Sequence, residues 1–302
     1  MRIVIAIATI VMLLGGGALA DDVYEIPRSL VQIESRPGIF TRMIVYRPEH
    51  PLATVILFPD GSGRLEITHV FNTPHIGRSG DVPWGVMHHL LRKNMTVVLM
   101  DAPTDHNSIL GINGWHGPRI FRLSRDHARD IGAAVDYLKQ RDPMPVWLAG
   151  IRMGAFSAAT AAIHLQQEVA GLVVAGGITQ CPEQKALLQL CPDGLMGLPL
   201  HEITVPTLIL SGRDAFPEPL LTSALSRSSA ISYQTYPEFA AFETKEWEPE
   251  GVTLLSGLSD AHLSREMANF IAWDQRIHPL LIALPGPVEM APVELYLAGI
   301  TF

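Results

Sequence analysis

Charged residues are scarce in this sequence, and long basic stretches are missing. Charged side chains make up 17% of the 302 positions, whereas hydrophobic ones make up 48%. This balance excludes a disordered chain, because disordered chains are rich in charge and poor in apolar side chains. The formal net charge is -8 and no basic stripe is present, so nucleic acid is not expected as a partner. No repeat of about 20 to 50 residues is visible, which excludes solenoid folds.

Cysteines are also few, since only Cys181 and Cys191 occur. We expect a disulfide between them if the chain is exported, and two separate buried thiols are the alternative. Their spacing is not that of a metal motif, and the histidines are not paired as metal ligands, so no metal is expected. No glycine-rich phosphate-binding motif follows a strand, and no cofactor is expected either.

Residues 1–20 have the features of a signal peptide. Met1-Arg2 is a positive start, residues 3–14 are continuously apolar, and Ala18-Leu19-Ala20 matches a cleavage site. The apolar run is shorter than the roughly 20 residues that a membrane-spanning helix needs. We therefore expect export to the periplasm or the exterior, with no stable membrane span once the signal is removed. An uncleaved anchor is the alternative.

Apolar runs alternate with helical patterns through most of the remaining chain. Strands are predicted at residues 31–34, 41–46, 55–58, 96–100, 146–149, 172–174, 207–210 and 231–236. Helices are predicted at residues 84–92, from Ser124 to Pro143, and at 153–167, 219–226 and 264–273. Continuously apolar strands that alternate with helices indicate a mostly parallel sheet with helices on both faces. We expect one α/β domain over residues 21–302, with about eight strands and a proline-containing apolar tail at 275–302.

One strand-to-helix junction carries a chemical motif. The strand at 146–149 runs into Gly150-Ile151-Arg152-Met153-Gly154, and a helix of small residues follows. This is the context of the G-x-S-x-G nucleophile elbow, in which a strained turn presents a serine. Here Arg152 stands at the position of that serine. Downstream, Asp214 and His262 each follow a predicted strand, in the order acid then histidine.

These features resemble the α/β-hydrolase superfamily, and within it the small esterases and dienelactone-hydrolase-like members, over about residues 45–275. The similar stretches are Asp101-Ala102-Pro103, Phe121-Arg122-Leu123-Ser124 with His127 and Asp130, and Pro145-Val146-Trp147-Leu148-Ala149-Gly150. The resemblance implies a serine nucleophile, absent here, with Asp214 as the acid and His262 as the base. It also places the oxyanion hole at Gly61, Ser62 and Met153.

Arginine at the elbow changes the expected chemistry. A guanidinium is always protonated and is no nucleophile. Arg152 therefore either points into solvent or needs an anion, which is Asp214, an acidic residue of 237–262, or a ligand. We expect an exported hydrolase-like protein that has lost acyl-enzyme chemistry and binds a small acyl or anionic ligand. One alternative is an active ester hydrolase that uses Ser62, Ser157 or a water activated by His262. Another is a non-enzymatic interaction protein that binds through residues 275–302.

Overall fold

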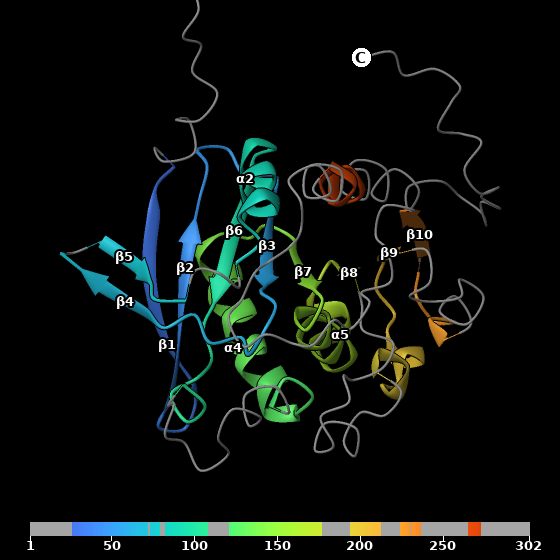
Figure 1. The fold of residues 1–302 in the computed structure, drawn as a ribbon, viewed down its shortest axis with the longest axis horizontal. Coiled ribbons are helices and arrows are strands. Elements are labelled where there is room, and N and C mark those ends of the chain that lie inside the picture. Colours follow the sequence, from blue (N-terminus) through green and yellow to red (C-terminus); the bar gives the residue numbers. More distant parts are fainter. Residues whose placement is uncertain are drawn as a thin grey trace, which may run out of the picture.

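A single eight-stranded sheet organises the protein, as the computed structural model shows (Figure 1). The structure describes residues 26–71, 73–78, 82–107, 121–176, 194–212, 224–229, 231–236 and 265–272. The strands are β1 (Arg28–Arg36), β2 (Ile39–Tyr46), β3 (Ala53–Phe58), β6 (Met95–Met100), β7 (Val146–Ile151), β8 (Gly171–Ala175), β9 (Thr207–Gly212) and β10 (Ile231–Tyr236). Their order is β1-β2-β6-β3-β7-β8-β9-β10. Strand β2 pairs antiparallel with β1 and β6, and all the other pairs in this sheet are parallel. The predicted mostly parallel sheet of about eight strands is confirmed.

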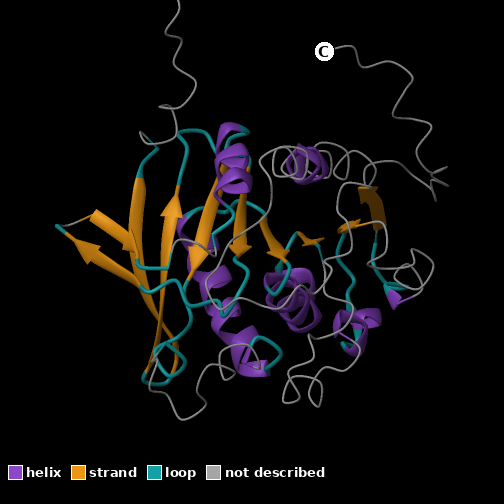
Figure 2. Ribbon diagram, in the orientation of Figure 1, coloured by secondary structure: helices purple, strands orange, loops and turns teal. Residues whose placement is uncertain are grey.

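Helices cover both faces of the sheet (Figure 2). Helix α2 (Trp84–Arg92) and the helical residues 265–272 lie on one face, whereas α4 (Arg125–Arg141) and α5 (Gly154–Leu165) lie on the other. Side chains alternate between two cores along each strand, as the twofold period of a strand requires. In β3, for example, Val55 and Leu57 pack with α2, whereas Ile56 and Phe58 pack with α4 and α5.

Short 3-10 turns complete the regular structure, at Gln166–Glu168, Gly194–Gly197 and Leu200–Glu202. They connect α5 to β8 and line the approach to β9. None of the described helices combines the length and hydrophobicity that a membrane span needs.

Helix α4 begins where the sequence predicts it. Ser124 lies in extended backbone and its hydroxyl accepts the amide of His127 at 3.1 Å, which satisfies one of the free N–H groups at the helix start. The predicted apolar face is buried and packs on the sheet, and it consists of Ile131, Ala134, Val135 and Leu138. This helix fixes the position of the segment before it, which contributes Arg122 to the site.

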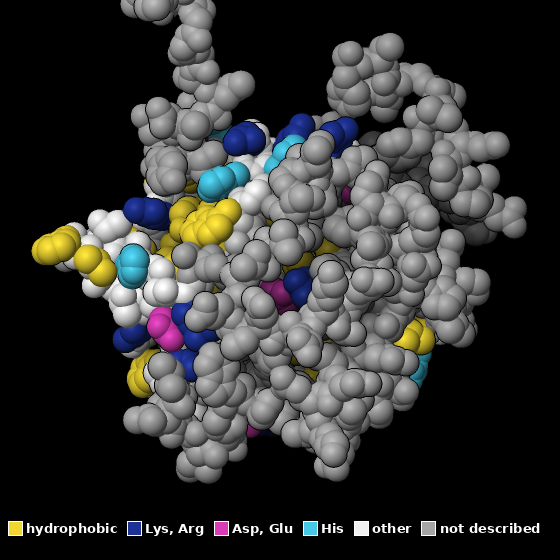
Figure 3. Space-filling view, in the orientation of Figure 1, with side chains coloured by type: hydrophobic (Ala, Val, Ile, Leu, Met, Phe, Trp, Pro, Cys, Tyr) yellow, Lys and Arg dark blue, Asp and Glu magenta, His cyan; other side chains and the backbone are white. Residues whose placement is uncertain are grey.

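One small hairpin is not predicted by the sequence pattern. Strands β4 (Ile67–Val70) and β5 (Thr73–Ile76) pair antiparallel and project from the edge of the molecule (Figure 1). Figure 3 shows hydrophobic side chains at the tip of this hairpin, where Phe71 is 99% exposed. The carboxylate of Asp101 anchors its base by accepting the amides of Leu65 and Ile67 at 2.7 and 2.8 Å.

The winding of the sheet creates a topological switch point between β3 and β7. The chain passes from β3 through α2 to β6 on one side, and then crosses by α4 to β7 on the other side of β3. The connections after β3 and β7 therefore lead to opposite faces of the sheet. Such a switch point is where open α/β sheets bind ligands, at the carboxyl ends of the strands.

Several sequence predictions lie outside the described residues. These are the signal peptide at 1–20, the disulfide between Cys181 and Cys191, the triad partners Asp214 and His262, and the tail at 275–302. The predicted helix at 219–226 lies mostly outside them as well.

Candidate functional site

Arg152 occupies the apex of a sharp turn between β7 and α5. Its φ of 51° lies in the left-handed region, which costs a non-glycine residue about 1–3 kcal/mol. Its amide donates to the carbonyl of Ala175 in β8 at 2.9 Å, which ties the turn to the sheet. The backbone therefore has the strained geometry that the elbow motif predicts, with a guanidinium in place of a hydroxyl.

The two glycines of the motif allow this turn to pack closely. A Cβ on Gly150 would lie 2.3 Å from the carbonyl oxygen of Gly154, and a Cβ on Gly154 would lie 2.2 Å from that of Phe58. Both distances are too short for any side chain. Helix α5 consequently begins in contact with the ends of β7 and β3, and Arg152 faces the loop that follows β3.

Among the described residues, an acidic partner of Arg152 is Asp60, the second residue after β3. Its Oδ2 lies 3.2 Å from Nε of Arg152, and its Oδ1 accepts the backbone N–H of Met153 at 3.1 Å. The two side chains are 27% and 21% exposed, so solvent reaches both. The sequence analysis did not propose Asp60, and the acids that it did propose lie outside the described residues.

Asp60 bears directly on the predicted oxyanion hole. Of its three residues, Met153 donates its amide to the Asp60 carboxylate, so a negatively charged oxygen already lies at this donor. Gly61 has a φ of 62° and turns the chain directly after Asp60. Ser62 is buried, and its hydroxyl accepts the amide of Arg64 at 3.3 Å. The arrangement resembles an oxyanion hole that holds one of the protein's own carboxylates.

The side chain of Arg122 connects the loop after β3 to the turn before α5. It is buried, and Nη2 donates to the carbonyls of Pro59 at 2.9 Å and Asp60 at 3.1 Å. Nη1 donates to the carbonyl of Met153 at 3.2 Å and to the hydroxyl of Ser157 at 3.0 Å. One rigid guanidinium thus sets the position of Asp60 relative to Met153.

A serine and a histidine lie next to Arg122. The Ser157 hydroxyl is 2.9 Å from Nε2 of His127, and both side chains are buried. Burial, aided by the positive charge of Arg122, lowers the pKa of His127 to about 3, so the ring is neutral at neutral pH. Ser157, which the sequence offers as an alternative nucleophile, is buried and contacts both His127 and Arg122.

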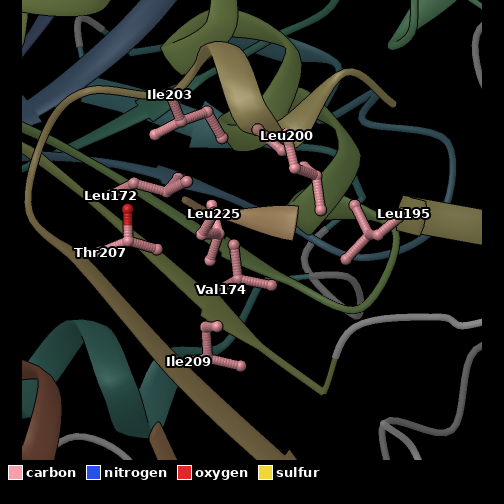
Figure 4. A pocket seen from close by; sticks show the side chains of 9 residues that line it. Leu172, Val174, Leu195, Leu200, Ile203, Thr207, Ile209 and Leu225 are labelled. Carbon is pink, nitrogen blue, oxygen red and sulfur yellow. The ribbon is translucent and has the colours of Figure 1, made fainter. Parts of the chain in front are cut away.

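Two small cavities lie near these residues. One, of about 20 Å³, is lined by both polar and apolar groups that include Ser62, Arg122, His127 and Ser157. The other, also about 20 Å³, lies between α5, β8, β9 and the 3-10 turns, where Leu195 and Leu200 face Leu172 and Val174 (Figure 4). Among the described lining residues, the one polar side chain is that of Thr207, whose hydroxyl donates to the carbonyl of Val205, so this second cavity is a feature of packing.

Positive charge outweighs negative charge at the elbow. Arg152 and Arg122 bring two positive charges against the single negative charge of Asp60, and the first turn of α5 adds the partial positive charge of a helix N-terminus. Within the described residues, no cluster of three or more histidine, cysteine, aspartate or glutamate side chains is placed to hold a metal ion. The arrangement of the described residues therefore suits a carboxylate or a similar small anion.

Comparisons with known proteins address the fold. Neither a protein-family model nor a curated protein matches the chain. Among solved structures, it is similar to DcsB in complex with its substrate analogue, at 14% identity and a TM-score of 0.54, covering 83% of this chain and 100% of that one. It is also similar to the Pyrococcus furiosus esterase PF2001, at 13% identity and a TM-score of 0.52, covering 85% and 94%.

A third similar structure is the proline iminopeptidase of Mycobacterium smegmatis, at 9% identity and a TM-score of 0.52, covering 82% of this chain and 99% of that one. These likenesses extend over most of each chain. The chain therefore has the α/β-hydrolase fold.

Proposed function

We propose that this chain is an exported, hydrolase-like protein that has lost acyl-enzyme chemistry and binds a small carboxylate or acyl compound at the elbow. Arg152 cannot attack a carbonyl carbon, because a guanidinium has no nucleophilic lone pair at ordinary pH. In a serine hydrolase, loss of the nucleophile lowers kcat by about 10⁶. What remains of the site is a set of anion-binding donors. The export part of the proposal rests on residues 1–20 of the sequence.

One observation carries the binding part of the proposal. Nε of Arg152 and the amide of Met153 converge on the two oxygens of one carboxylate, that of Asp60, at 3.2 and 3.1 Å. Arginine and backbone amides are common partners of carboxylates, and the N-terminal turn of α5 adds to the attraction. The carboxylate of a small ligand would make the same contacts.

Binding of short carboxylates tests the proposal. Acetate, butyrate and hexanoate are titrated calorimetrically into the wild type and into Arg152→Gln, which keeps a polar chain but removes the charge. We expect the variant to bind at least about tenfold more weakly. The matched control is Arg129→Gln, since Arg129 is 68% exposed on α4 and pairs only locally with Asp126. Equal affinity in the wild type and in Arg152→Gln would contradict the proposal.

A second candidate function is ester hydrolysis with a different nucleophile. The 2.9 Å contact between the Ser157 hydroxyl and His127 favours it, because a nucleophile must lie this close to its base. An ester would have to reach a serine that is only 1% exposed. Turnover of p-nitrophenyl acetate that disappears in Ser157→Ala would support this candidate, and loss in His262→Ala would support an activated water instead. A rate that neither variant changes would refute both.

A further inference from the structure

The carboxylate of Asp60 contacts the amide of Met153 and Nε of Arg152, the two donors that the carboxylate of a ligand would use. We infer that Asp60 and Arg152 form a two-residue lock on the oxyanion position, so that a carboxylate ligand binds by displacing Asp60. The inference rests on the proposed function, because it concerns the same donors. It adds a residue that determines affinity at this site, and it predicts that one substitution alone does not restore an ester-hydrolysing elbow.

The backbone holds Asp60 in its blocking position. Its carbonyl and that of Pro59 accept Nη2 of Arg122, while Nη1 of the same guanidinium binds the carbonyl of Met153. The positive φ of Gly61 then turns the chain away. The carboxylate of Asp60 is thus delivered to the amide of Met153 by a buried and well-anchored loop, whereas the carboxylate itself is partly solvent-exposed and can be exchanged.

A tethered carboxylate is a strong competitor for a free one. Groups on a short tether act at an effective concentration of about millimolar or more. A free carboxylate must therefore exceed this level, or gain further contacts, before it replaces Asp60. Removal of the Asp60 carboxylate takes this competing acceptor away from the amide of Met153 and from Nε of Arg152. The affinity for a simple carboxylate should then rise.

The same contact makes a single reversion at the elbow ineffective. In Arg152→Ser, the carboxylate of Asp60 still accepts the amide of Met153, and its charge is no longer balanced by Arg152. A negative charge at this point repels the oxyanion that forms when an ester is attacked. Reopening the position therefore requires changes at both residues.

Acetate binding to a set of variants tests the lock. Asp60→Ala should bind acetate at least about tenfold more tightly than the wild type, and Asp60→Ala/Arg152→Gln should lose this gain. Asp60→Asn should fall between the wild type and Asp60→Ala, because its amide oxygen still accepts the Met153 N–H but carries no charge. Glu49→Ala removes an exposed acid remote from the site and should leave the affinity unchanged. Circular dichroism and Tm verify that each variant is folded.

The outcomes separate the two proposals. If Arg152→Gln weakens binding but a folded Asp60→Ala binds no more tightly than the wild type, the lock is wrong and the proposed function stands. If the wild type and Arg152→Gln bind alike, the proposed function fails, and the lock is judged by Asp60→Ala against Asp60→Ala/Arg152→Gln alone. In a second assay, Arg152→Ser/Asp60→Ala should hydrolyse p-nitrophenyl acetate faster than Arg152→Ser. Equal rates in these two variants contradict the lock.

Discussion

Two arginine–aspartate pairs in this protein have the same chemistry but different roles. Arg36 and Asp130 join β1 to α4, with Nε of Arg36 2.8 Å from Oδ1 of an aspartate that is completely buried. Arg152 and Asp60 join two loops at the carboxyl edge of the sheet, and both side chains are partly exposed. The first pair connects regular elements, whereas the second depends on a strained turn. Burial and backbone geometry therefore separate a structural pair from a pair that ligands can reach.

The surroundings of the two pairs reinforce the difference. Burial alone would lower the pKa of Arg36, but hydrogen bonds and attraction from Asp130 and Asp105 raise the pKa above its ordinary value. The hydroxyl of Ser35 also donates to Asp130, so the buried carboxylate has several partners. We therefore expect that no small solute displaces these partners from the carboxylate of Asp130. The pair at the elbow has a backbone amide as its second partner, and a ligand can take the place of its carboxylate.

The largest expected effect is on the structural pair. Arg36→Gln leaves the carboxylate of Asp130 buried without its cation, which should lower the free energy of unfolding by about 3–5 kcal/mol. Urea denaturation measures this change. Arg129→Gln is the control, because an exposed pair contributes at most about 1 kcal/mol. A loss in Arg36→Gln no larger than that in the control would mean that the pair is not structural.

Gly154→Ala should break the elbow without touching either charged side chain. The added Cβ would lie 2.2 Å from the carbonyl of Phe58, so α5 must shift away from β3, at a cost of about 1–3 kcal/mol or more. We expect a lower Tm together with weaker acetate binding. Gly38→Ala is the matched control: nothing lies within 4 Å of its added Cβ, and only the strain of its positive φ remains. Equal losses in the two variants would contradict the close contact.

His127 gives the elbow region a predicted pH dependence. Its pKa is about 3 in the folded protein and about 6.5 when exposed, so the unfolded state binds more protons between these values. The contribution of His127 to the free energy of unfolding is fully present above pH 6.5. It falls as the pH drops below this value, by up to about 1.4 kcal/mol per pH unit. His127→Asn should flatten this slope in urea unfolding measured from pH 7 to about pH 4. If the free energy of unfolding depends on pH equally in the wild type and in the variant, the lowered pKa of His127 is disproved.

Replacing Arg152 should have the smallest effect on the free energy of unfolding, because the pair at the elbow is not a structural pair. Arg152→Gly relieves the strain of the positive φ, worth about 1 kcal/mol or more, but loses the partly exposed pair with Asp60, which contributes about 0–1 kcal/mol. The net change in the free energy of unfolding should therefore stay within about 1 kcal/mol. Chemical denaturation checks this value. A loss of several kcal/mol would show that Arg152 stabilises the fold as Arg36 does.

The parts of the fold that sequence reasoning predicts are those with local signals. Strands β3 and β7 are continuous apolar runs, and α4 has a capping serine and a regular apolar face, so each is recognisable from its own residues. The hairpin β4–β5 was missed because its strands are four residues long and mostly exposed, and such segments have no clear alternation.

The site was only partly predictable for a related reason. Glycine spacing at a strand-to-helix junction is a local signal, and it places Arg152 at the turn. The contact between Arg152 and Asp60 depends on β3 and β7 being neighbours, which is a property of the sheet order rather than of either segment. Arg122 likewise reaches two loops that are 63 and 31 residues away in sequence, so no local pattern indicates its role.

The amide of Met153 offers the most direct measurement of the central claim, because this claim is that Asp60 holds that N–H. Its ¹H–¹⁵N signal is recorded in the wild type, in Asp60→Ala and in Asp60→Ala with acetate. Loss of a hydrogen bond to a charged acceptor should move the amide proton upfield in the variant, and saturating acetate should move it back. A Met153 signal that is the same in the wild type and in Asp60→Ala, and that acetate leaves unchanged, would contradict the account.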